Sequence, residues 1–295
     1  MDNINNVYVV KILYLDDEKI FKKFTNFHQE KKKIDKINFL FESIQNELYS
    51  YKIDENREIY EFFDTYFLLI RDNISFSSDK NYNKEQLEKL YKFQSDFDNV
   101  ICKQDGENFA YLFNGNCDNN IISLAIRHSK TLKLTNNNSY DNDDLKAVFD
   151  NGNLAVMSKI ADSKDKFERF LILFVLALAY NKKIFNFLNK TSSYYNDKNF
   201  KKMIEIRDEY LKFDLNAYFD NPIKPTKIQV YEIYKIISDK LATKNLHSEL
   251  KLQISDLVQV IYEKQKTKQD RKITIFGTII GFLSLIATIV TIIYS

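Results

Sequence analysis

The sequence has few of the residues that build redox, metal and nucleotide sites. Among 295 residues there are two cysteines, three histidines, five glycines, two prolines and no tryptophan. The cysteines, Cys102 and Cys117, form no CxxC pair and the histidines have no zinc-ligand spacing, so neither a disulfide framework nor a zinc site is indicated. No Walker A loop and no GxGxxG, GxSxG or HExxH motif is present. We therefore predict that the protein is not an enzyme and holds no metal or cofactor.

Charge is close to balanced, with 43 Lys and Arg against 41 Asp and Glu, so bulk charge indicates no polyanion partner. The acidic clusters Asp16-Asp17 and Asp141-Asp143-Asp144 are more typical of solvated loops or helix starts than of cation sites. Arg127-His128 lacks the spacing of a HEPN-type ribonuclease pair. Tyr194-Tyr195, close to two lysines, could stack bases but is more typical of a surface loop.

One long uncharged stretch stands out at the C-terminal end, residues 273–295. As a helix it would span about 34 Å, enough to cross a hydrocarbon core of about 30 Å. A helix of this length in an aqueous core would normally carry charges on its outer face. We therefore predict a transmembrane helix.

Small and polar residues form one stripe along this predicted helix. They recur at alternating steps of three and four, which is a heptad spacing: Thr274, Gly277, Gly281, Ser284, Thr288, Thr291 and Ser295. Apolar side chains gain nothing by meeting each other in lipid, so the stripe is predicted to face protein. With no second span in the prediction, the simplest partner is another copy of the chain.

Three interpretations of the stripe remain open. The hydroxyls could bond back to a carbonyl one turn earlier, as Ser and Thr do in many membrane helices. The glycines could allow a tight dimer or bundle. Several helices could instead form a ring whose hydroxyls line a narrow aqueous path. Such a path has no ring of charged side chains and would discriminate weakly between ions.

Basic residues precede the predicted span and none follows it. They are Lys264, Lys266, Lys268, Arg271 and Lys272. The positive-inside tendency places the N-terminal part in the cytoplasm and the C-terminus outside, and the same residues suit anionic lipid headgroups. Because the abundance of Asn, Lys, Ile, Tyr and Phe is typical of an AT-rich bacterial genome, we predict a bacterial inner membrane.

The fold class predicted for the whole chain is α+β, with a mixed α/β N-terminal domain, a helical stalk and one transmembrane helix. The predicted strands are 7–15, 100–103, 109–113, 121–127, 131–135 and 154–160. The predicted helices of this half are 20–27, 34–48, 59–70, 84–93 and 145–149. Gly106 and Gly115 between the middle strands favour a small antiparallel sheet there.

From residue 166 the chain is predicted to be almost wholly helical. The apolar run 170–180 is too short to span and is predicted to be a buried core helix. Pro222 and Pro225 should end the amphipathic helix 199–219, and heptad-spaced apolar residues over 246–261 continue toward the membrane. We divide the chain into a cytoplasmic sensing domain (1–165), a helical domain (166–245), a stalk (246–272) and a transmembrane helix (273–295).

Residues 165–295 resemble a known family. The features that carry the resemblance are Arg207, Tyr210, Phe213, the Tyr218-Phe219 pair, Pro222, and a stalk that enters the predicted span at 272–277. This plan resembles the CorA-type metal-ion transporters, in which an α/β cytoplasmic domain feeds a stalk helix into an oligomeric pore. The GlyMetAsn pore motif is absent and one span is predicted rather than two, so divalent-cation selectivity does not carry over. Single-span CorA-like proteins are similar to membrane effectors of bacterial anti-phage defence, the Hailong-type channel subunits.

These observations predict a homo-oligomeric membrane channel or effector with a cytoplasmic domain that gates a pore of one C-terminal helix per subunit. The resemblance implies a role in anti-phage defence and a nucleotide or oligonucleotide ligand on the cytoplasmic domain. The alternatives are a tail-anchored membrane scaffold and a CorA-like ion transporter without the usual selectivity motif.

Overall fold

The computed structural model describes residues 5–15, 30–76, 107–114, 122–123, 125–126, 138–150, 152–159 and 163–294. They form an α+β fold with a mixed sheet and with helices in the C-terminal half. The chain packs as two units. The first is Met1–Phe185 with Lys212–His247, and the second is Asn186–Leu211 with Ser248–Ser295.

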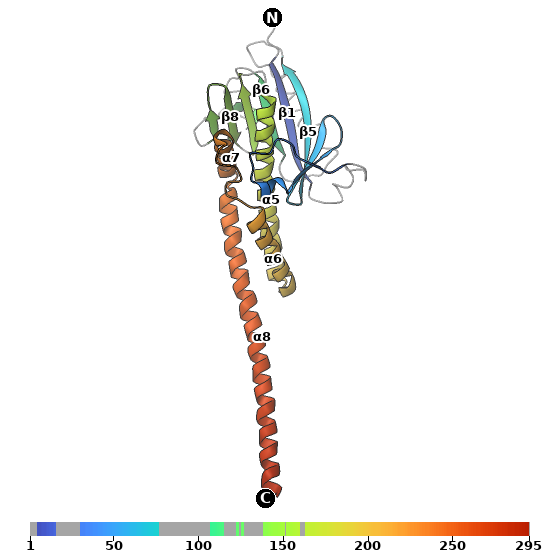
Figure 1. The fold of residues 1–295 in the computed structure, drawn as a ribbon, viewed down its shortest axis with the longest axis vertical. Coiled ribbons are helices and arrows are strands. Elements are labelled where there is room, and N and C mark those ends of the chain that lie inside the picture. The colour runs from blue at the N-terminus through green and yellow to red at the C-terminus, as the bar shows by residue number, and fades with distance from the viewer. Residues whose placement is uncertain are drawn as a thin grey trace. The chain divides into compact units, whose positions relative to one another are not determined.

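The first unit is built on a sheet that has nine strands within the described residues (Figure 1). In spatial order they are β2 (Lys32–Lys33), β3 (Leu48–Lys52), β4 (Arg57–Phe62), β5 (Thr65–Phe76), β1 (Asn5–Leu15), β6 (Asn108–Asn114), β9 (Asn153–Ser158), β8 (Leu145–Asp150) and β7 (Ser139–Asp141). Neighbouring strands are antiparallel, except that β6 and β9 are parallel. The long strands β1 and β5 therefore lie at the centre.

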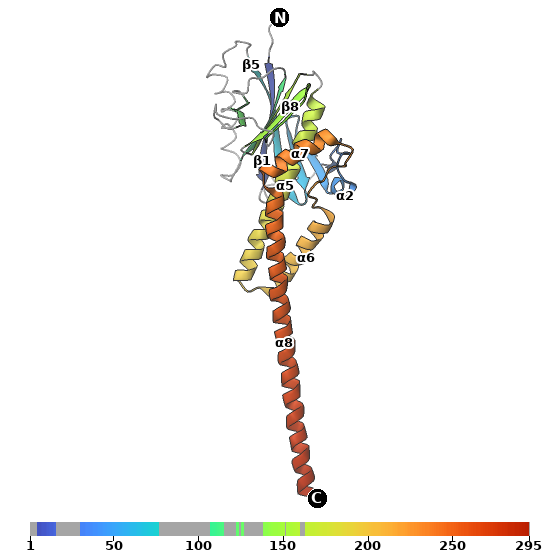
Figure 2. The same cartoon turned by 90° about the vertical axis from the view of Figure 1, so that its left-hand side faces the viewer.

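The two faces of the sheet have different coverings. On β1, Val7 and Val9 point to one face, where they join a buried cluster with Tyr111 and Ile122. Tyr8 points to the other face and meets the ring of Phe167 edge-on at 5.7 Å. Phe167 belongs to α5 (Lys164–Asn196), which as far as Phe185 lies along this second face (Figures 1 and 2). Helix α7 (Ile228–Lys240) contacts β7 and β8.

The predicted core helix 170–180 is confirmed as part of α5. Every side chain from Phe170 to Tyr180 is at most 8% exposed, because the helix lies between the sheet and other helices of the first unit. Among the residues whose side chains the structure describes, which in α8 end at Ser284, α5 is also the one helix long and apolar enough to cross a membrane, and 72% of its most apolar part is buried. Its hydrophobicity is accounted for by this burial.

The helix predicted for 59–70 is wrong. These residues form the β4–β5 hairpin, in which Phe62 pairs with Thr65 across a two-residue loop. Both loop residues have positive φ, 54° at Phe63 and 58° at Asp64, as a type I′ turn requires. No Asn-Gly or Asp-Gly marks this turn in the sequence, and a run of aromatic and aliphatic residues does not by itself separate helix from strand.

Other predictions for the N-terminal half had mixed outcomes. The strands at 7–15, 109–113 and 154–160 are confirmed, and all three lie in one large sheet, so the separate small sheet predicted around 109–113 is wrong. The helix predicted for 34–48 is wrong, since only α2 (Glu42–Gln45) is helical there. The predictions at 145–149 and 121–127 are also wrong: the first is β8, and the described residues of the second are helical. The predicted elements 20–27, 84–93, 100–103 and 131–135 lie outside the described residues.

The second unit consists of helices. It contains the end of α5 from Asn186, α6 (Phe200–Asn216) as far as Leu211, and α8 (Thr243–Tyr294) from Ser248. Phe187 and Tyr210 pack edge-on, with ring centroids 5.9 Å apart. The heptad-spaced Leu250, Ile254, Leu257 and Ile261 of α8 are 0–4% exposed. The predicted apolar stripe of the stalk is therefore a real packing surface within this unit.

Candidate functional site

The C-terminal part of α8 is the first candidate site. The helix is continuous through the predicted stalk and the predicted span (Figure 1). From Tyr262 to Ser284 every residue is exposed, whereas Ile261 is 4% exposed. The exposed apolar side chains, each 51–68% accessible, are Ile273, Ile275, Phe276, Ile279, Ile280, Phe282 and Leu283. A single chain therefore leaves a long apolar surface uncovered.

The stripe lies on this exposed stretch. Thr274, Gly277, Gly281 and Ser284 are exposed on α8; Thr288 and Thr291 lie in the helix but their side chains are not described, and Ser295 is outside the described residues. Thr274 Oγ1 donates a hydrogen bond to the Asp270 carbonyl at 2.9 Å, so the back-bonding interpretation holds at this position. A Cβ added at Gly277 or Gly281 would meet nothing within 4 Å, which leaves room for a neighbouring helix.

The basic residues before the predicted span are all exposed. Lys264 Nζ lies 2.9 Å from the centroid of the Phe200 ring, a cation–π contact within the second unit. The other basic residues, Lys266, Lys268, Arg271 and Lys272, have no ion-pair partner among the described residues. Their placement is compatible with lipid contact, and the membrane span itself stays a prediction.

Deleting residues 273–295 is expected to leave a soluble, folded protein. The buried residues of α8 end at Ile261, so the deletion removes no described part of either core. Size-exclusion chromatography and circular dichroism would check this, with the expected result being a helical, cooperatively melting protein. An insoluble product would show that the predicted boundary of the membrane segment is misplaced.

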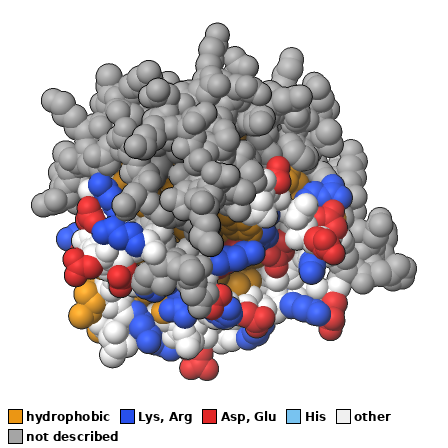
Figure 3. Space-filling view, turned by 90° about the horizontal axis from the view of Figure 1, so that it is seen from above, with side chains coloured by type: hydrophobic (Ala, Val, Ile, Leu, Met, Phe, Trp, Pro, Cys, Tyr) orange, Lys and Arg blue, Asp and Glu red, His pale blue; other side chains and the backbone are white. Residues whose placement is uncertain are grey.

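The second candidate site is a cavity of about 400 Å³ in the first unit, at the end of the sheet where α5 begins. Its lining residues are Tyr8, Lys52, Asp54, Glu55, Asn56, Arg57, Glu58, Arg71, Asn73, Lys164 and Glu168. A second cavity of about 820 Å³ shares Lys52, Glu58 and Glu168 with it. Viewed from above, Lys/Arg and Asp/Glu side chains are interleaved on the described surface (Figure 3).

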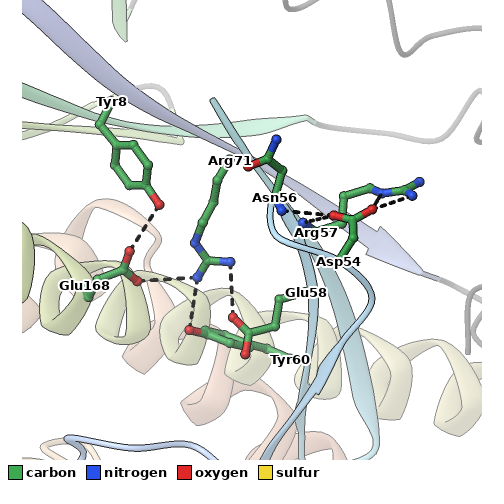
Figure 4. Close-up of polar contacts among 8 residues, drawn as sticks. All are labelled: Tyr8, Asp54, Asn56, Arg57, Glu58, Tyr60, Arg71 and Glu168. Atoms are coloured by element: carbon green, nitrogen blue, oxygen red, sulfur yellow. Dashed lines mark hydrogen bonds and ion pairs between the residues drawn. The ribbon is translucent and has the colours of Figure 1, made fainter. Parts of the chain in front are cut away.

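Arg71 is the centre of the polar contacts in this cavity (Figure 4). It comes from β5, its side chain is 14% exposed, and Nη1 lies 3.1 Å from Glu58 Oε2 on β4. Nη2 lies 3.4 Å from Glu168 Oε2 on α5 and donates to Tyr60 Oη at 3.3 Å. Tyr8 Oη on β1 donates to the other oxygen of Glu168 at 3.4 Å. The guanidinium therefore connects β5, β4 and α5 directly, and β1 joins the network through Glu168.

Burial and neighbouring charges keep Tyr8, Tyr60 and Arg71 in fixed protonation states. Burial raises the pKa of Tyr8, and the neighbouring Glu168 raises it further, so the phenol remains a donor. Burial and Glu58 likewise raise the pKa of Tyr60. Burial by itself lowers the pKa of Arg71, but the effects of Tyr60, Glu168 and Glu58 together are larger, so the pKa of Arg71 is raised overall. The guanidinium is therefore charged at any physiological pH.

The turn between β3 and β4 forms one wall of the cavity. Asp54 Oδ1 accepts from the backbone amides of Asn56 and Arg57 at 2.9 and 2.8 Å, and Arg57 Nε donates to Oδ2 at 2.6 Å. The hydrogen bond from the Arg57 side chain is the largest of the effects that lower the pKa of Asp54. The Asn56 carbonyl accepts from the Arg71 amide at 2.8 Å. This turn thus holds the backbone of Arg71 in place.

The cavity could hold an anionic group without displacing Glu58 or Glu168 from Arg71. Lys52 and Lys164 both line it, and neither has a carboxylate partner among the described residues. Lys164 Nζ lies over the Tyr8 ring, 4.8 Å from its centroid. Sequence reasoning missed this site, because Tyr8, Glu58, Arg71 and Glu168 are brought together only by strand register and by the docking of α5.

The remaining candidate residues form no site in the described structure. Asp141 is an exposed residue of β7 whose carboxylate lies 3.7 Å from Lys146, and no group of three His, Cys, Asp or Glu among the described residues could hold a metal. Tyr194 contacts Lys202 within the second unit. Asp16-Asp17 and Arg127-His128 lie outside the described residues.

Comparison with known proteins adds no identification. No protein-family model, no curated protein and no solved structure matches this chain.

Proposed function

We propose that the protein is a homo-oligomeric membrane channel or effector in which one C-terminal helix per subunit contributes to a pore. The observation that carries the proposal is the uncovered surface of α8 from Ile273 to Leu283, with apolar side chains 51–68% exposed on an unbroken helix. In water such a surface would aggregate. Lipid on one side and copies of the same helix on the polar stripe would cover all of it.

The first unit is proposed to be the cytoplasmic part that controls this pore. Its support is the cavity beside Arg71, which has a deep polar network and two lysines without a carboxylate partner in the described structure. A ligand with an anionic group, such as the nucleotide implied by the resemblance, would bind there and bias the protein between closed and open packings. The role in anti-phage defence stays a prediction from the resemblance.

The test is the membrane potential of bacteria that overproduce the intact chain. Wild-type protein is expected to depolarise the inner membrane and slow growth, as measured with a voltage-sensitive dye. The matched control is the chain that lacks residues 273–295, which should have no effect at equal abundance. If wild type never depolarises cells, the channel proposal fails and a tail-anchored scaffold becomes the better interpretation.

A further inference from the structure

The segment of α8 from Glu263 to Lys272, here called the collar, is not covered by its own chain. Up to Ile261 one side of the helix is buried by the second unit, but every residue of the collar is exposed. The collar is also the most charged part of the helix, with two acidic and five basic residues in ten positions. In a single chain the surface of the collar is therefore exposed and available to contact lipid or another protein.

The charges of the collar follow the register of the polar stripe. Asp270 precedes Gly277 by seven residues and Glu263 precedes Asp270 by seven, so these positions lie on one side of the helix, about two turns apart. A basic residue follows each acid, Lys264 after Glu263 and Arg271 after Asp270. An acidic row and a basic row thus run side by side on the continuous helix.

Neither acid is paired with a basic residue of its own chain in the described structure. Glu263 Oε1 accepts from Gln259 Nε2 at 3.1 Å, and the Asp270 carbonyl, not its carboxylate, accepts from Thr274 Oγ1. Lys264 lies over the Phe200 ring, whereas Arg271 has no ion-pair partner among the described residues. The pair with the most freedom to bind another chain is therefore Asp270 and Arg271.

We propose that the collar is a self-association surface, in which Asp270 of one copy pairs with Arg271 of the next. Where parallel helices pack along a heptad seam, a residue of the seam lies against the flanking residue of its neighbour, and charges at flanking positions select partner and orientation. If the stripe residues form the seam, Asp270 lies in it and Arg271 flanks it. Cyclic symmetry repeats the same pair at every interface.

The remaining charges show why a second copy fits this surface better than lipid does. Lys268 and Lys272 lie on the opposite side of the helix from Asp270, where they can meet anionic headgroups. A headgroup would be repelled by Asp270, whereas a second copy provides both signs in the matching order. The proposal rests on the homo-oligomer of the proposed function and names the contact that sets its register.

The experiment measures the concentration at which full-length protein in detergent dissociates, by light scattering after size exclusion. Asp270→Arg and Arg271→Asp are each expected to raise this concentration about fivefold, since an exposed pair has a modest effect per interface. The exchange of both residues, Asp270→Arg with Arg271→Asp, is expected to restore the wild-type value. Added salt should raise the concentration at which the wild-type oligomer dissociates, because exposed charges are screened.

Lys268→Asp and Lys272→Asp make the same change of charge as Arg271→Asp on the other side of the helix, and they should leave dissociation unchanged. If these controls weaken assembly as much as Arg271→Asp, general basic charge is responsible and the collar proposal is overturned. It is equally overturned if the double exchange shows the sum of the single effects. A monomeric wild type would refute the proposed homo-oligomer as well. If the protein is an oligomer whose dissociation none of these variants changes, only the collar proposal is refuted.

Discussion

Replacement of Arg71 by methionine is expected to lower the free energy of unfolding by about 3 kcal/mol, toward the low end for a broken buried ion pair. The side chains of Glu58 and Glu168 are 25% and 24% exposed, and without the guanidinium they would face each other without a cation. For a domain of this size the loss corresponds to a melting temperature about 6–12 °C lower. Thermal unfolding of the full chain in detergent would measure it.

Arg57→Met is the matched control for this change. Arg57 also pairs with a carboxylate of the same sheet region, but its side chain and that of Asp54 are 43% and 40% exposed. Exposed pairs contribute about 0–1 kcal/mol, so this variant should melt within a few degrees of wild type. Adding Glu58→Gln and Glu168→Gln to Arg71→Met should recover part of the lost stability. Equal melting temperatures for the two single variants would show that the Arg71 network does not hold the sheet to α5.

Ser284→Leu is expected to abolish the depolarisation of cells that the proposed channel causes, while leaving its assembly intact. Ser284 is an exposed residue on the stripe of α8. An added leucine in each copy would narrow and dewet a path lined by hydroxyls without introducing charge. Thr288→Leu and Thr291→Leu should act in the same way. The measurement is the dye signal, with chemical crosslinking alongside it to report the amount of oligomer.

Ile279→Leu and Ile286→Leu are the controls, because they exchange one apolar side chain for another on the side predicted to face lipid. They should leave both the potential and the crosslinking unchanged. Should Ser284→Leu conduct as well as wild type, the hydroxyl stripe does not line the path. The interpretation of a tightly packed bundle without a pore would then account better for the glycines and hydroxyls.

Helical periodicity was sufficient for the C-terminal half. The heptad spacing of Leu250, Ile254, Leu257 and Ile261 predicts a packed helix face, and these residues are buried. The two prolines predict the break between α6 and α7, and the breaks at Asn216 and Ile228 lie on either side of them. Such features are local, because a helix is stabilised by hydrogen bonds between residues four apart and its faces are set by its own sequence. Whether α8 enters a membrane stays a prediction from the same pattern.

The sheet was decided by tertiary structure. The sequence pattern of residues 59–70 predicts a helix. These residues are strands in the structure because β4 pairs with β5 and β5 pairs with β1. A strand is stabilised by partners that can lie far away in the sequence. The same register places Arg71 opposite Val10 and brings Glu58 and Glu168 within reach of its guanidinium. The sequence alone determined that the C-terminal half is helical and that the chain breaks near its two prolines, although α5 (Lys164–Asn196) extends well beyond the predicted 170–180. The cavity at Arg71 exists only because strands and a helix from separate parts of the chain meet there, and no local pattern encodes that meeting.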